Sequence, residues 1–173
     1  ELEAATAKSE SHVAIFGYGR AGQTLARVLE ASNEPYIAID NTPARVAAAA
    51  AAGHPVFYAD AGRDKTLDMM GLDSVRLAIV AMGEAHSGAD LVMALKRRRP
   101  DLPIYARARG QEAQTLLRNA GADVVVREVA ESSLHMGGAI LRGLGRERED
   151  VAATIDAFRE DEYRALSAFL DSS

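Results

Sequence analysis

A glycine pattern near the start of the chain has the spacing of a phosphate-binding loop. Three glycines form G-x-G-x-x-G directly after a short apolar run and at the start of a stretch with helical periodicity. In that setting the first glycine permits a tight turn, the second lets phosphate approach the backbone, and the third lets helix and strand pack closely. The helix N-terminus would offer amide groups to the phosphate; the alternative is a turn with a structural role only. The candidate binding residues are Gly17, Tyr18, Gly19, Arg20, Ala21 and Gly22.

An acidic residue stands where a dinucleotide-binding fold holds the adenosine ribose. Asp40 ends the second apolar run, 23 positions after Gly17, and its carboxylate would accept hydrogen bonds from both ribose hydroxyls. Its charge would repel a 2′-phosphate, which disfavours NADP. The sequence therefore predicts NAD(H) or an adenine nucleotide, AMP or ATP, and does not distinguish them because they share the adenosine half. The alternative is that Asp40 caps a turn with Asn41, itself a candidate contact.

Two later segments add candidate contacts to the nucleotide. Asp60 follows the third apolar run and could hold the adenine edge through its carboxylate or through the amide of Ala61. Alternatively, Asp60 caps a helix that begins near Gly62. At the end of the fourth run, backbone groups would line the nucleotide where the order of the strands reverses. These backbone groups belong to Ala81, Met82 and Gly83.

The charged side chains near these segments favour binding over catalysis. Arg107 is a candidate nucleotide contact, and with Arg109 it could bind an anionic effector, unless both arginines pair with neighbouring carboxylates. Glu84 and His86 are the candidates for a general acid or base, and neither belongs to a recognisable catalytic set. The chain has no cysteine, and no histidine pair has metal-ligand spacing. We therefore expect no catalytic residues and no metal site.

Six short β-branched runs alternate with helical stretches, which is typical of a parallel sheet with crossover helices. Right-handed connections between such strands give the order 3-2-1-4-5-6, with ligands at the carboxyl ends of strands 1 and 4. We expect an α/β fold: a doubly wound, parallel, six-stranded Rossmann sheet with a C-terminal helical extension. The expected strands are 12–16, 36–40, 56–58, 75–82, 104–107 and 124–127.

Length and composition fit one main domain. The 173 residues are 48% hydrophobic and 26% charged, and the net charge of −5 argues against a nucleic-acid surface. No apolar run approaches the roughly 20 residues that span a bilayer, and the lack of cysteine fits the cytoplasm. We expect a linker at 1–11, the nucleotide-binding domain at 12–145, and at 146–173 an amphipathic helix that dimerises or folds back. Its apolar residues are Val151, Ile155, Phe158, Leu166, Phe169 and Leu170.

Several ordered motifs resemble the cytoplasmic regulatory domain called RCK or TrkA-N. The resemblance covers about residues 12–170 and is closest to the C-terminal domain of Kef-type potassium/proton antiporters. One position departs from the family pattern, because Ala59 stands where a glycine usually precedes the aspartate, and this tightens the approach of a ligand to the backbone. The motifs are FGYGRAG at 16–22, YADA at 58–61, ARAR at 106–109, GADVVVRE at 121–128 and FREDEYR at 158–164.

The resemblance implies a regulatory module rather than an enzyme. Domains of that family hang beneath a membrane transporter, dimerise, and bind NAD(H) or adenine nucleotides such as AMP; the glutathione-gated members also bind glutathione. The implied partners are the transporter domain of the same full-length protein and a second copy of the chain, with no nucleic acid. From the residues, the alternative is a small NAD-dependent oxidoreductase subunit whose substrate-binding part comes from a partner.

Overall fold

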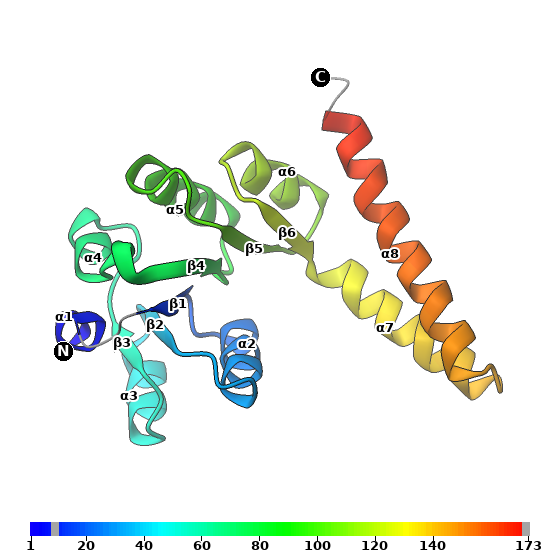
Figure 1. Cartoon of the computed structure of the whole chain (residues 1–173), viewed down its shortest axis with the longest axis horizontal. Coiled ribbons are helices and arrows are strands. Elements are labelled where there is room, and N and C mark those ends of the chain that lie inside the picture. Colours follow the sequence, from blue (N-terminus) through cyan, green and yellow to red (C-terminus); the bar gives the residue numbers. More distant parts are fainter. Residues whose placement is uncertain (8–10, 171–173) are drawn as a thin grey trace. The chain divides into compact units, whose positions relative to one another are not determined.

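The computed structural model describes residues 1–7 and 11–170, with side chains as far as Glu160. Strands and helices alternate along the chain (Figure 1). The strands are β1 (His12–Phe16), β2 (Tyr36–Asp40), β3 (Val56–Tyr58), β4 (Val75–Val80), β5 (Ile104–Ala108) and β6 (Val124–Arg127). The helices are α1 (Leu2–Ala7), α2 (Arg20–Ala31), α3 (Pro43–Ala51), α4 (Asp64–Met69), the 3-10 turn η1 (Leu72–Ser74), α5 (Ala85–Arg98), α6 (Gln111–Asn119), α7 (Glu128–Gly143) and α8 (Arg148–Leu170).

The six strands form one parallel sheet in the expected order. The order is β3-β2-β1-β4-β5-β6, so the direction of winding reverses between β1 and β4. The expected bounds of β1, β2, β3 and β6 are confirmed, whereas β4 ends at Val80 and β5 continues to Ala108. Beyond Val80 the amide of Ala81 still donates to the carbonyl of Phe16 at 2.9 Å. This contact holds the ends of β1 and β4 side by side.

Strand β1 is buried on both faces, which explains its apolar sequence. Ala14 and Phe16 lie in one hydrophobic cluster, which also contains side chains of α4, α5 and α6. Val13 and Ile15 lie in a second cluster with Ala26 of α2 and with α3. Because alternate residues of a strand point to opposite faces, a sheet covered on both sides needs apolar residues at successive positions. The loop that follows Phe16 therefore starts from a rigid, buried strand.

The opening residues differ from the expectation that they form a linker outside the fold. Residues 2–7 form α1, and Leu2 is buried in the larger hydrophobic cluster. The hydroxyl of Thr6 donates a hydrogen bond to the carbonyl of Met69 at 3.0 Å. Leu2 and the hydrogen bond of Thr6 thus hold α1 beside α4. So few residues take part that the sequence of α1 does not show the apolar spacing of a helix.

The chain divides after Val126, and the residues from Arg127 onward form a compact unit of their own. This division lies earlier than the boundary expected at residue 145, because α7 packs against α8 and belongs with it. Val151 is buried, and both Val151 and Ile155 lie against Gly138 of α7. The last helix therefore folds back onto α7.

One apolar residue of α8 stays outside this contact, since Phe158 is 61% exposed. Leu166, Phe169 and Leu170, expected on the same apolar face, have side chains outside the described residues. None of the helices in the described part of the chain is both long enough and apolar enough to cross a membrane.

Candidate nucleotide-binding site

The first and third glycines of the loop are required by close packing. Gly17 has φ of +100°, and a Cβ there would lie 3.2 Å from the carbonyl carbon of Ala81 and from the amide nitrogen of Met82. A Cβ on Gly22 would lie 2.1 Å from the carbonyl oxygen of Gly17. Neither position has room for a side chain, so Gly17 turns the backbone across the end of β4 and Gly22 brings α2 against the turn.

The second glycine has open space around it. A Cβ on Gly19 would meet no heavy atom within 4 Å, and Gly19 is the N-cap residue of α2. The first amide groups of a helix have no partner within it, and they point outward from its N-terminus. The chain therefore presents bare backbone at the position where the sequence predicts that phosphate approaches.

Asp40 holds the loop through a buried carboxylate. Its side chain is 3% exposed, and its Oδ2 accepts hydrogen bonds from the amide of Tyr18 and from the guanidinium of Arg45, each at 2.7 Å. Its Oδ1 accepts from the amide of Thr42 at 2.8 Å. Burial alone would raise the pKa of Asp40, but these donors outweigh it and hold the pKa below its ordinary value. The carboxylate is therefore charged at neutral pH.

The hydrogen bonds of Asp40 include the turn contact expected for it, and the ribose contact stays a prediction. The bond to the amide of Thr42 is the local turn contact, made across the exposed Asn41. The bond to Tyr18 joins β2 to the glycine loop, 22 positions earlier in the chain. The carboxylate therefore stands at the loop, as a ribose ligand must, and it also shapes the backbone on either side.

Arg45 is a site residue that sequence reasoning missed. It lies in the first turn of α3, five positions after Asp40, and pairs with the buried carboxylate. A cation this close offsets part of the repulsion between Asp40 and a 2′-phosphate. In the sequence, Arg45 is only an arginine on the helix that follows a strand ending in an acidic residue. That pattern is too common to identify a binding-site residue.

Tyr18, Arg20 and Ala21 enter the site chiefly through their backbone. The ring of Tyr18 is buried beneath the loop beside the ring of His54, with 6.4 Å between centroids. Its carbonyl accepts a hydrogen bond from the side-chain Nε2 of Gln23 at 3.1 Å. Arg20 and Ala21 begin α2, and the side chain of Arg20 is exposed.

Asp60 lies at the carboxyl end of β3 with its side chain 54% exposed. Its Oδ1 accepts a hydrogen bond from the amide of Gly62 at 3.0 Å, and its Oδ2 lies 3.5 Å from Nε of Arg63. Helix α4 begins only at Asp64, with Arg63 as its N-cap residue. Asp60 therefore caps the turn before the helix rather than the helix itself. The adenine contact through Asp60 or Ala61 stays a prediction.

A cleft of about 230 Å³ adjoins the carboxyl ends of β4 and β5. Met82 and Gly83 line it from one strand end, and Arg107 and Arg109 line it from the other. Nε of Arg107 donates to the carbonyl of Ala81 at 3.1 Å, so this arginine is tied to the strand end. The arrangement brings positive charge close to the turn around Gly17.

Glu84 and His86 are occupied by helix capping. Glu84 is the N-cap residue of α5, and its carboxylate accepts from the amides of His86 and Ser87 at 2.9 and 2.6 Å. Hydrogen bonds, first from Ser87 and then from His86, lower the pKa of Glu84 to about 2. His86 lies 3.3 Å from the same carboxylate and is largely exposed. A carboxylate this acidic is a poor proton acceptor at neutral pH.

Comparison with known proteins identifies the relatives of this arrangement. The family model for the TrkA-N domain matches residues 13–128. The chain is 30% identical over 172 residues to K(+) efflux antiporter 2, chloroplastic, of Arabidopsis thaliana, a match that covers 99% of this chain and 15% of that protein. It is 32% identical over 157 residues to the putative K(+) efflux antiporter KefB of Alkalimonas amylolytica, covering 91% of this chain and 24% of that protein.

A solved structure shares the fold over most of the chain. It is the Kef CTD of Shewanella denitrificans in its AMP-bound form, with a TM-score of 0.78 and 26% identity. The match covers 90% of this chain and 95% of that one. The chain thus corresponds to a small part of the antiporters and to nearly all of a Kef CTD, which confirms the resemblance seen in the sequence. The chain belongs to the TrkA-N domain family.

Proposed function

We propose that the chain is the ligand-sensing regulatory domain of a potassium/proton antiporter or potassium channel, located in the cytoplasm, and that an adenine nucleotide bound at the glycine loop gates cation transport. The observation that carries the proposal is the open backbone at Gly19, beside a buried and charged Asp40. The AMP-bound Kef CTD supports the class of ligand. The match to potassium efflux antiporters supports the transporter as partner.

Contacts within the chain hold the glycine loop in its shape. Asp40 holds the amide of Tyr18, and the close packing of Gly17 and Gly22 fixes the turn on either side of Gly19. A phosphate would then bind the amides at the start of α2 without reordering the backbone, which reduces the entropy lost on binding. Oδ1 of Asp40 accepts one hydrogen bond and has a further lone pair for a ribose hydroxyl.

The identity of the ligand and its effect on transport are tested separately. Mass spectrometry of the small molecule that co-purifies with the chain should find AMP, ATP or NAD(H). Potassium flux through the full-length protein in vesicles should then change when that nucleotide is added on the side of the domain. A flux that ignores the nucleotide at saturating concentration would contradict gating even if binding is measured.

The oxidoreductase alternative would take its general acid or base from Glu84 or His86. Glu84 has a pKa of about 2 because the cap at the start of α5 holds its carboxylate. His86 lies in the first turn of α5, and its side chain is largely exposed. A general acid or base must reach the reacting atoms with a pKa near the working pH. The arrangement of these two residues therefore favours a binding domain over an enzyme.

We expect AMP and NADH to bind about tenfold more tightly than NADPH, which is about 1.4 kcal/mol. The charge of Asp40 disfavours the 2′-phosphate, and Arg45 offsets part of this effect. Arg45→Gln should therefore increase the preference for AMP and NADH over NADPH. Arg27→Gln, at an exposed position of α2, should leave that preference unchanged. Titration calorimetry of the three ligands measures the ratios, and equal affinities in the unmodified chain would refute the role of Asp40.

We also propose that the C-terminal helices form the contact of a homodimer. Four large apolar side chains, three on α7 and one on its C-cap residue, are 55–74% exposed, and their spacing places them on one side of the helix. Phe158 adds exposed apolar surface on α8. A two-fold pairing of this surface would remove it from water, which is the commonest way for soluble domains to do so. The four residues are Val129, Met136 and Ile140 of α7 and the C-cap residue Leu144.

Phe158→Asp is expected to raise the dissociation constant of the dimer about tenfold, because it places a charge in the contact. AMP affinity should stay unchanged, since Phe158 is not part of the glycine loop. Val28→Asp is the matched control, because Val28 on α2 is 58% exposed and lies outside the proposed contact. Sedimentation velocity over a concentration series measures both variants. A monomeric unmodified chain at high concentration would rule out the dimer.

A further inference from the structure

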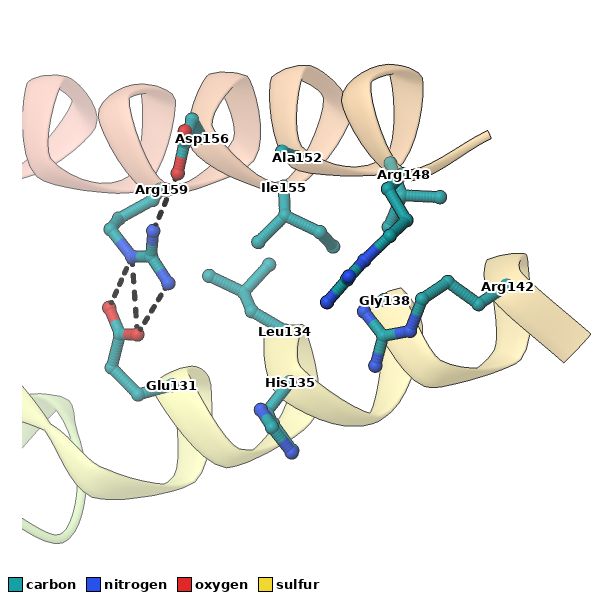
Figure 2. A pocket seen from close by; sticks show the side chains of 11 residues that line it. Glu131, Leu134, His135, Gly138, Arg142, Arg148, Ala152, Ile155, Asp156 and Arg159 are labelled. Carbon is teal, nitrogen blue, oxygen red and sulfur yellow. Dashed lines mark hydrogen bonds and ion pairs between the residues drawn. The ribbon is translucent and has the colours of Figure 1, made fainter. Parts of the chain in front are cut away.

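A second cleft lies between α7 and α8 and is lined only by residues of the C-terminal unit. It has a volume of about 400 Å³ and is lined by side chains of both helices (Figure 2). Leu134, Val151 and Ile155 provide apolar surface along it. A Cβ on Gly138 would be in ordinary van der Waals contact with α8, at 3.5 Å from Cγ1 of Ile155 and 3.6 Å from Cγ1 of Val151. The cleft is therefore lined by closely packed residues of both helices.

At one end of the cleft, an arginine is paired with carboxylates of both helices. Arg159 of α8 bonds Glu131 of α7 in a forked arrangement, with Nε to Oε1 and Nη2 to Oε2 each at 3.0 Å. Nη1 of Arg159 donates to Asp156 at 2.7 Å. Figure 2 shows these three side chains joined across the gap between the helices. One guanidinium is thus shared by two carboxylates, and this end of the cleft does not attract an anion.

The other end carries two arginines that face each other. Arg148, the first residue of α8, and Arg142, in the last turn of α7, extend their guanidinium groups toward one another beside Gly138 (Figure 2). Nη1 of Arg142 lies 3.5 Å from where a Cβ on Gly138 would be, so this side chain folds over the helix. Within the described part of the chain, neither guanidinium has a carboxylate within ion-pair distance.

We propose that Arg142 and Arg148 bind the phosphate group of a small molecule in this cleft, at a site separate from the nucleotide loop. Two guanidinium charges match the charge of a phosphate near −2, and each offers a fork of N–H donors suited to its oxygens. Bound phosphate would relieve the repulsion between the two cations, and the N-terminal end of α8 adds favourable potential. The apolar lining leaves room for the body of a phosphate monoester.

The acidic residues nearest in sequence to the two arginines do not line the cleft. Glu147, in the connecting turn, and Glu149 and Asp150, in the first turn of α8, are all exposed. Arg146 belongs to the same turn, is exposed, and also lies outside the lining residues. Arg146 therefore provides a control with the same change of charge a few residues from the proposed site.

The test uses inorganic phosphate and glycerol phosphate as probes, titrated at constant ionic strength. The protein is the whole chain with Gly19→Val, a substitution chosen to block phosphate at the glycine loop. The readout is the amide NMR signal of Gly138. We expect saturable shifts that weaken about tenfold in Arg142→Gln and in Arg148→Gln. Binding should be partly retained in the Arg→Lys variants, which keep the charge but lose the fork, and unchanged in Arg146→Gln.

The outcomes separate a site from a general charge effect. Tighter binding of glycerol phosphate than of inorganic phosphate would identify an organic monoester as the ligand, and equal binding would identify free phosphate. An equal loss in Arg146→Gln would overturn the proposal, because the attraction would then be non-specific. An unmoved Gly138 signal in the Gly19→Val chain would also overturn it. If AMP binding to the unmodified chain fails while phosphate still moves Gly138, the nucleotide proposal falls and this one stands.

Discussion

Gly19→Val is expected to abolish AMP binding while changing the thermal stability of the chain only slightly. The backbone of Gly19 has φ of −70° and ψ of −165°, a conformation open to L-residues, and an added Cβ meets no heavy atom within 4 Å. The folded chain therefore has room for valine, whereas a phosphate in contact with the backbone does not. Titration calorimetry should detect no binding, and added AMP should no longer raise Tm.

Gly22→Ala is the matched control for this prediction, because it changes a glycine of the same loop with the opposite consequence. Its Cβ would lie 2.1 Å from the carbonyl oxygen of Gly17, so backbone must move. We expect a loss of about 1–3 kcal/mol in the free energy of unfolding, together with weaker binding. If Gly19→Val still gained Tm from AMP, the glycine loop would not be the binding site.

Much of the sheet could be predicted because its signals are local. Strand β1 is buried on both faces, so its residues form a continuous apolar run. That run predicts a strand and also its central place in the sheet, between β2 and β4. The glycine spacing likewise follows from contacts within one turn, such as that between Gly22 and Gly17. Where a residue is dictated by its immediate neighbours in the chain, its type is informative by itself.

The features missed from the sequence depend on contacts across the fold. The ion pair of Arg45 with Asp40 exists because that carboxylate is buried beside the loop, which no local period indicates. Helix α1 is held by Leu2 in the core and by the bond of Thr6 to Met69, 63 positions away. The domain boundary lies before α7 rather than after it because α7 packs against α8, and the apolar pattern of α7 alone does not identify that partner. Such contacts can be identified only when the tertiary structure is known.

Asp40→Asn is expected to lower the free energy of unfolding at pH 7 by about 2–3 kcal/mol. The substitution keeps the shape of the side chain but removes the charge that accepts bonds from Tyr18, Thr42 and Arg45. An amide would also present an N–H group to these donors, so at least one buried donor would lose its acceptor. Urea unfolding at pH 7 measures the difference.

The dependence of this effect on pH distinguishes a charged carboxylate from a packing role. The pKa of Asp40 is lower in the folded chain than its ordinary value of 3.8, because the hydrogen bonds outweigh the effect of burial. The charge therefore contributes its full stabilisation above about pH 4, and this contribution is lost as the pH falls through the folded pKa. Unfolding curves of the unmodified chain and of Asp40→Asn should converge on acidification.

Asp73→Asn, at an exposed position on η1, is the control and should have the stability of the unmodified chain at every pH. If the gap between the unmodified chain and Asp40→Asn stayed constant down to pH 2, the neutral side chain would account for the stabilisation and the charge at the loop would not.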